Sequence, residues 1–62
     1  MDVALMIASE LGRAHRGQMV VWNRRRYLIK DIQHVGNSHV RVVVGNGLTI
    51  SYAPSDEVTV EP

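Results

Sequence analysis

Three consecutive arginines, Arg24, Arg25 and Arg26, have the clearest capacity for chemistry in this sequence. They lie between the only tryptophan, Trp22, and a tyrosine, Tyr27. Adjacent guanidinium groups repel one another and gain nothing in an apolar core, so they are stable only in water or against an anion. Cations beside aromatic rings are the combination with which proteins hold phosphates and stack bases. The segment is therefore a candidate nucleic-acid-binding site.

More distant cations could widen this site, because arginines also occur near the end of a predicted N-terminal helix. The candidate nucleic-acid-binding residues are then Arg13, Arg16, Trp22, Arg24, Arg25, Arg26 and Tyr27. The competing interpretation is a solvated hairpin turn whose charges keep the neighbouring strand edge from aggregating. Both interpretations stay open from the sequence alone.

Trp22 and Tyr27 also have an interpretation as core residues. A hairpin would place them nearly opposite each other on one face, where an aromatic pair contributes roughly 0.2–1 kcal/mol. The chain contains no phenylalanine, so its few aromatic rings are needed for packing, and core packing is the favoured interpretation. The less favoured alternative is an aromatic cage for a methylated cation, formed together with Tyr52.

The histidines and the remaining acids give weaker signals. His34 and His39 flank a predicted turn and could begin a metal site, but no third ligand lies nearby in the sequence. Asp56 and Glu57 resemble a catalytic pair, yet a capping turn accounts for them equally well. The chain has no cysteine, and we find no Ser–His–Asp pattern or phosphate-cradling glycine loop. We therefore expect a protein that is not an enzyme and that holds no metal or cofactor.

The length of 62 residues predicts a single domain, 1–62, with a small core. The lack of cysteine suits a reducing, cytoplasmic setting. No apolar run approaches the roughly 18–20 residues that span a bilayer, and Asp2 follows the first residue without a basic leader. We expect neither a membrane partner nor a signal peptide. The size and the ends of the chain suit a small bacterial or phage product.

Charge is distributed unevenly along the chain. Residues 1–31 contain six basic and three acidic side chains, a balance of +3, and residues 32–62 contain one basic and three acidic, a balance of −2. Such asymmetry can mark a face that binds nucleic acid. It can equally allow the two halves to neutralise each other where they meet, which is the interpretation that we slightly favour.

A short helix is predicted over about residues 2–12, with Asp2 as its N-cap and Gly12 as its stop. Its apolar positions at the spacing of one helical face are Val3, Met6, Ile7, Leu11 and Ala14. A helix this short is not stable alone and must dock on something. Two roles stay open: it plugs one end of the domain, or Leu5 and Met6 form a protein-interaction surface, as in a homodimer.

The chain beyond Gly17 reads as strands and turns. The predicted strands are 18–22, 27–35, 39–44, 48–52 and 58–60. Tyr27 and Ile29 are at odd-numbered positions and Ile32 is at an even-numbered one, so a regular strand would place Ile32 on the opposite face. A β-bulge near Lys30 and Asp31 would return all three to one face and bend the strand. A hairpin turn is predicted at residues 46–47, an Asn-Gly pair, and one helical turn at residues 54–57.

This pattern resembles the small SH3-like barrels, the group that contains SH3, Tudor, KOW and bacterial Sm-like domains. The resemblance covers about residues 17–61 and rests on the hairpin at 17–29 and the closing segment at 53–60. It implies a mainly β fold class, a five-stranded SH3-like small barrel, here with a short N-terminal α-helix. It also implies a binding module, because such barrels often bind nucleic acid through loops at one end.

Two functional hypotheses follow for a small non-enzymatic binding module. The leading hypothesis is DNA or RNA binding through the arginine-rich hairpin tip. The alternative is a protein–protein interaction or regulatory module that acts through the apolar N-terminal helix or a strand edge, with a protein partner or a second copy of the chain.

Overall fold

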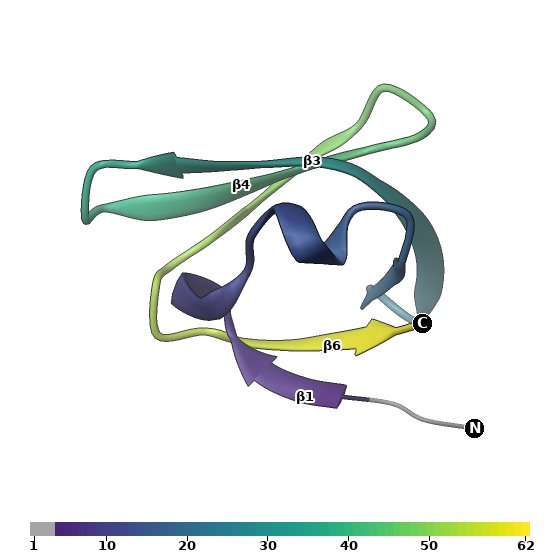
Figure 1. The fold of residues 1–62 in the computed structure, drawn as a ribbon, viewed down its shortest axis with the longest axis horizontal. Coiled ribbons are helices and arrows are strands. Elements are labelled where there is room, and N and C mark those ends of the chain that lie inside the picture. The colour runs from purple at the N-terminus through teal and green to yellow at the C-terminus, as the bar shows by residue number, and fades with distance from the viewer. Residues whose placement is uncertain (1–3) are drawn as a thin grey trace.

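A computed structural model describes residues 4–62 and shows six antiparallel strands in one open sheet (Figure 1). The strands are β1 (Ala4–Ile7), β2 (Met19–Trp22), β3 (Arg25–Val35), β4 (His39–Val44), β5 (Thr49–Tyr52) and β6 (Glu57–Glu61). Their order across the sheet is β1-β6-β2-β3-β4-β5. The prediction of a small, mainly β protein is therefore confirmed, with strand bounds close to those expected from the alternation of apolar residues.

The sheet bends back on itself along β3. The pairing of β3 with β4 shifts register between Ile29 and Asp31, which confirms the predicted bulge. The bulge keeps Ile29 in the core and turns Ile32 toward the same core, as the change of parity requires. Figure 1 shows the result: β3 and β4 lie above β6 and β1, and the segment between β1 and β2 lies between the two layers.

Alternating aliphatic side chains from both layers fill the space between them. The buried hydrophobic residues are Ala8, Leu11, Val20, Ile29, Val40, Val42, Val44, Ile50, Tyr52, Val58 and Val60. Every second residue of β4 is a buried valine, because successive side chains of a strand point to opposite faces. The predicted hairpin joins β4 to β5, but its loop is residues 45–47 rather than the Asn-Gly pair alone: the Val44 amide donates to the Leu48 carbonyl at 3.0 Å, and the Gly47 amide donates to the Val44 carbonyl at 3.2 Å. Gly47 has the positive φ, 83°, that closes such a three-residue loop.

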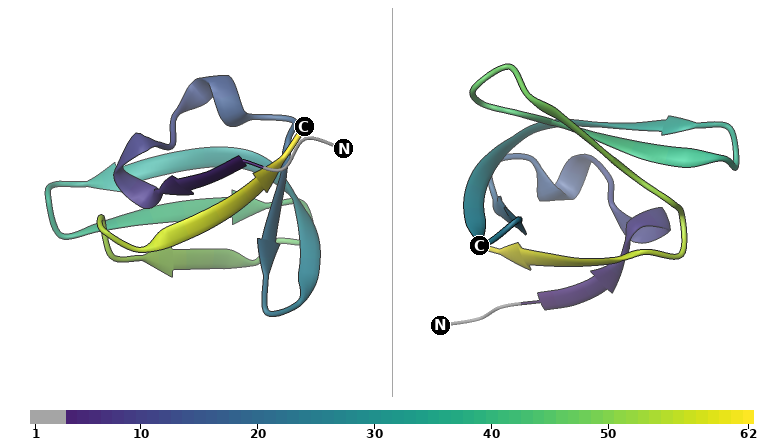
Figure 2. Two further views of the ribbon diagram at one scale, coloured as in Figure 1. Left: turned by 90° about the horizontal axis from the view of Figure 1, so that it is seen from below. Right: turned by 180° about the vertical axis from the view of Figure 1, so that it is seen from behind.

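The predicted N-terminal helix is wrong. Residues 2 and 3 of that prediction lie outside the described part of the chain, and Ala4–Ile7 forms the strand β1, which pairs with β6. Two single 3-10 turns follow, η1 (Ala8–Glu10) and η2 (Arg13–His15). An isolated helix of this length is marginal, whereas the edge of β6 offers backbone partners to an extended segment. Figure 2 shows β1 alongside β6 in both views.

The prediction of a five-stranded barrel with an N-terminal α-helix is also wrong, because the segment expected to be the helix forms β1. β1 adds a sixth strand and the sheet stays open, with β1 at one edge and β5 at the other. The helical turn expected before β6 is also wrong. The chain makes a tight turn there, in which the Asp56 amide donates to the Ala53 carbonyl at 3.0 Å and the Ala53 amide donates to Asp56 Oδ2 at 2.9 Å.

Candidate nucleic-acid interface

The arginine run begins in the turn of the β2–β3 hairpin. Trp22 pairs with Arg25, so the turn consists of Asn23 and Arg24 alone. Their φ values are 52° and 65°, the left-handed conformation that both central residues of a type I′ turn adopt. Asparagine tolerates this conformation well, but arginine does not. The fold therefore holds the Arg24 side chain at the apex of the hairpin at a conformational cost.

The other two arginines belong to β3, and strand alternation sends them to opposite faces. Arg25 lies opposite Trp22, on the face of the hairpin that carries Tyr27. Arg26 lies on the other face, where its Nη1 is 3.4 Å from Glu61 Oε1 of β6. The three arginines therefore do not share one face: Arg24 is in the turn, Arg25 lies beside Trp22, and Arg26 is paired with a carboxylate on the opposite face.

The Arg26–Glu61 pair explains part of the uneven charge along the chain. β2 pairs with both β3 and β6, so the last strand lies within reach of the arginine-bearing hairpin. Glu61 belongs to the acidic half of the sequence and Arg26 to the basic half. At this point the two halves neutralise each other, as the favoured interpretation of the charge pattern expected.

The two aromatic rings of the hairpin lie together but differ in burial. The ring centroids of Trp22 and Tyr27 are 6.2 Å apart, and the ring planes are tilted by 57°. Tyr27 lies opposite Val20, so the two rings are diagonal neighbours rather than direct partners. Tyr27 packs against the core, whereas Trp22 keeps 38% of its surface exposed. Core packing is therefore confirmed for Tyr27 and wrong for Trp22, which lies beside Arg25 at the tip.

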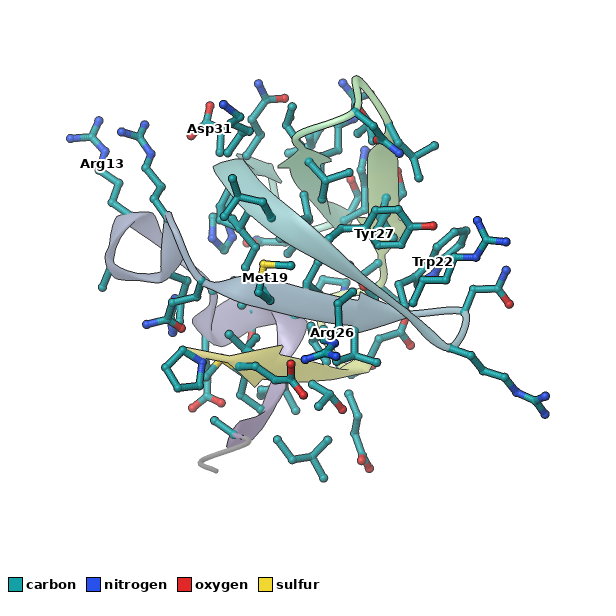
Figure 3. All side chains as sticks on the ribbon, turned by 90° about the vertical axis from the view of Figure 1, so that its right-hand side faces the viewer. Arg13, Met19, Trp22, Arg26, Tyr27 and Asp31 are labelled. Atoms are coloured by element: carbon teal, nitrogen blue, oxygen red, sulfur yellow. The ribbon has the colours of Figure 1, made fainter. Side chains whose placement is uncertain are left out.

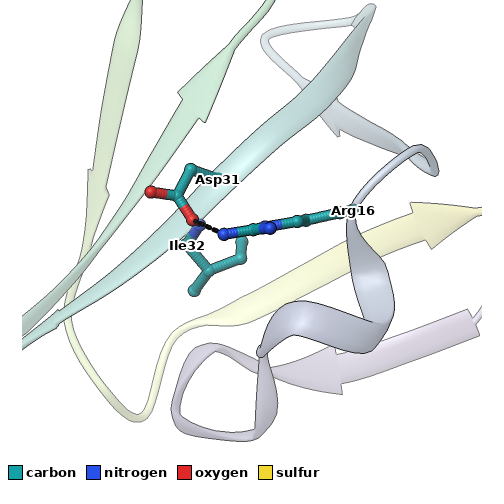
Figure 4. Close-up of polar contacts among 3 residues, drawn as sticks. All are labelled: Arg16, Asp31 and Ile32. Atoms are coloured by element: carbon teal, nitrogen blue, oxygen red, sulfur yellow. Dashed lines mark hydrogen bonds and ion pairs between the residues drawn. The ribbon is translucent and has the colours of Figure 1, made fainter.

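Arg13 and Arg16 do not join this tip. Figure 3 places Arg13 and Asp31 at one end of the β2–β3 hairpin and Trp22 at the other. Arg16 Nη2 lies 3.0 Å from Asp31 Oδ1, and the Ile32 amide donates to the same oxygen at 2.9 Å (Figure 4). The Arg16 hydrogen bond first, and that amide second, hold the pKa of Asp31 below its ordinary value of 3.8. The prediction of one continuous patch with Arg13 and Arg16 is wrong.

The other candidate sites are not assembled. Tyr52 is buried in the core and does not form a cage with the hairpin aromatics. His34 Nε2 lies 2.7 Å from the Leu11 carbonyl oxygen, and His39 Nδ1 lies 2.9 Å from Ser38 Oγ, so the two rings have separate partners. Within residues 4–62 no group of three histidines, cysteines or acids could hold a metal ion.

The predicted protein-interaction residues lie on β1 rather than on a helix. Leu5 is 65% exposed and Met6 packs against the core, because neighbouring residues of a strand face opposite sides. Leu5 therefore stays available to a partner and Met6 does not.

The tip that remains consists of Trp22, Arg24, Arg25 and Tyr27, which we call the tip site. Sequence reasoning named all four residues but missed the place of the turn. The signal was Asn23, since asparagine is favoured where φ is positive and marks a two-residue turn at residues 23–24.

Comparison with protein-family models, with curated proteins and with solved structures found no match for this chain. The described residues also include no helix that is long and apolar enough to cross a membrane.

Proposed function

We propose that this chain is a small non-enzymatic binding module that holds single-stranded DNA or RNA at the tip site. In this proposal Trp22 stacks on an unpaired base, and Arg24 and Arg25 contact the phosphates on either side of it. Tyr27 supports the Trp22 ring from the core side. Single strands are the proposed ligand because their bases are free to stack on an exposed aromatic ring.

The observation that carries the proposal is the backbone of Arg24. Its φ of 65° would be strain-free for glycine, the residue that usually follows asparagine in such a turn. A non-glycine residue in this conformation costs about 1–2 kcal/mol. Strain of this kind collects where a side chain is needed for function. Here it fixes a cation at the most projecting point of the hairpin.

The pairing of the arginines with carboxylates also supports the tip site. Among the described residues, ion pairs join Arg16 to Asp31 and Arg26 to Glu61. Neither pair uses Arg24 or Arg25, and both of these residues are exposed. A phosphate at the tip would therefore not have to displace a carboxylate of the chain.

Binding of a dye-labelled single-stranded 12-mer, followed by fluorescence anisotropy at several salt concentrations, tests the proposal. We expect the affinity to fall as the salt concentration rises. For two phosphate contacts on a single strand, the logarithm of the binding constant should fall with the logarithm of the salt concentration with a slope of roughly −1.4. The double variant Arg24→Ala/Arg25→Ala should bind about tenfold or more weakly, since each lost contact is a charge-assisted hydrogen bond.

The matched control is Arg13→Ala/Arg41→Ala, which removes the same charge from exposed positions away from the tip. It should keep most of the affinity. Equal losses in both double variants would show that net charge alone attracts the nucleic acid, and a wild-type chain that binds nothing at low salt would rule the function out.

We further propose a cytoplasmic location, because a chain without cysteine gains nothing from an oxidising compartment. The likeness to the SH3-like group stays an interpretation of the sequence pattern between residues 17 and 61, and the tip site does not depend on it.

A further inference from the structure

The outer edge of β1 presents backbone groups that the sheet does not use. The Ala8 amide donates to the Asp56 carbonyl at 2.8 Å, in the register that pairs Met6 with Val58. In an antiparallel ladder the residues that bond the neighbouring strand alternate with residues that face away from it. The backbone N–H and C=O groups of Leu5 and Ile7 therefore face away from β6, at the open edge of the sheet.

β1 itself lacks two of the features that usually protect an edge strand. No residue of β1 is charged or a proline, which are the common means of blocking the addition of another strand. Leu5 and Ile7 are 65% and 42% exposed, and both side chains lie on the outer face of the sheet. The opposite edge of the sheet differs. In β5 the exposed side chains on the outer face are Thr49 and Ser51, which are polar, whereas those of β1 are apolar.

One side chain does cover part of the β1 edge. The turn η1 carries Glu10 back toward the strand, and the Ile7 amide donates to Glu10 Oε1 at 3.3 Å. This bond occupies one of the outward-facing donors of β1. A strand that is added to the edge would have to displace the Glu10 carboxylate.

We propose that the β1 edge pairs with β1 of a second copy of this chain, and that Glu10 opposes this pairing. In an antiparallel arrangement about a two-fold axis at Met6, Leu5 of one copy lies opposite Ile7 of the other. The two residues with outward-facing backbone groups then bond each other reciprocally, which makes the interface self-complementary.

Charge and side-chain pattern also favour a second copy as the occupant. A charged strand paired with itself about a two-fold axis brings like charges close together, and the uncharged β1 avoids this penalty. Pairing would bring the exposed Leu5 and Ile7 side chains of both copies together on the outer face and join the two sheets into one. This inference is independent of the tip site, which lies on the β2–β3 hairpin.

Sedimentation velocity of the whole chain, from about 10 μM to 1 mM, tests the proposal. The wild type should show a concentration-dependent monomer–dimer equilibrium. Glu10→Ala should tighten the dimer about tenfold, because two Ile7 amides no longer have to leave a carboxylate. Leu5→Lys should abolish the dimer by placing a like charge from each copy at the new interface.

A synthetic chain that is N-methylated at the Leu5 amide removes the outward-facing donor and keeps every side chain. It should be monomeric with an unchanged circular dichroism spectrum, and this spectrum also shows whether each variant is folded. Leu48→Lys, at an exposed leucine in the β4–β5 turn, is the matched control and should leave the dimer unchanged. Monomers throughout, Glu10→Ala included, or a dimer that survives both Leu5 changes, would overturn the proposal.

Discussion

The hydroxyl of Tyr52 is the clearest case in which a single residue works against stability. Its oxygen is buried and has no hydrogen-bond partner among the described residues. Burial first, and the nearby Asp56 carboxylate second, raise the pKa of Tyr52 above its ordinary value of 10.0. A buried hydroxyl without a partner loses the bonds that it would make to water.

Tyr52→Phe should therefore stabilise the fold, by about 1 kcal/mol, as measured by urea unfolding at neutral pH. The wild type should also lose stability as the pH rises above 10, because the unfolded Tyr52 releases its proton before the folded one does. The variant should show less of this loss. A Tyr52→Phe chain that is clearly less stable than the wild type would mean that the hydroxyl has a partner after all.

Asp31 gives the opposite pH dependence. Its pKa is lowered in the folded chain by Arg16 and the Ile32 amide, so its contribution to stability is complete above the unfolded pKa. That contribution is lost as the pH falls through the lower, folded pKa. Asp31→Asn should lower the melting temperature most at pH 7 and least near about pH 2. A difference that stays constant across this range would show that the carboxylate charge has no part in it.

At the scale of elements, the turn of the β2–β3 hairpin holds Arg24 in a strained backbone conformation, which lowers the free energy of unfolding. Arg24→Gly should raise the free energy of unfolding by about 1 kcal/mol, because glycine accepts the φ of 65° without strain. The same change should weaken binding of a single-stranded 12-mer. Chemical denaturation and anisotropy on one preparation measure both effects. Arg24→Ala is the control: it should weaken binding without the gain in stability, since alanine keeps the Cβ.

The N-terminal segment shows where local pattern fails as a guide to an element. Residues 3–8 are all apolar, and the periodicity of such a short run does not distinguish a strand from a segment of a buried helix. The choice is made by β6, whose backbone needs a partner and which lies more than forty residues away in the sequence. By contrast, β4 and the bulge in β3 follow directly from alternation, because every second residue must face the core.

At the scale of the whole molecule, topology decides which cations can act together. The sequence predicted the four tip residues, since their types alone suggest an aromatic and cationic surface. It could not show that Arg26 meets Glu61 through the β2–β6 pairing, or that Arg16 meets Asp31 at the far end of the hairpin. Both pairs join residues that are distant in sequence. Only the folded structure therefore shows that Arg13, Arg16 and Arg26 are not part of the tip site, which leaves four of the seven candidate residues.

The emission of Trp22 gives the most direct test of the central claim, because it is the only tryptophan and belongs to the tip site. Titration of the wild type at low salt with an unlabelled single-stranded oligothymidine should quench this emission in a saturable way, since a base stacks on the ring. Added salt should reverse the quenching, and Arg24→Ala/Arg25→Ala should shift the midpoint about tenfold higher. Trp22 emission that stays unchanged throughout the titration would contradict the proposed function.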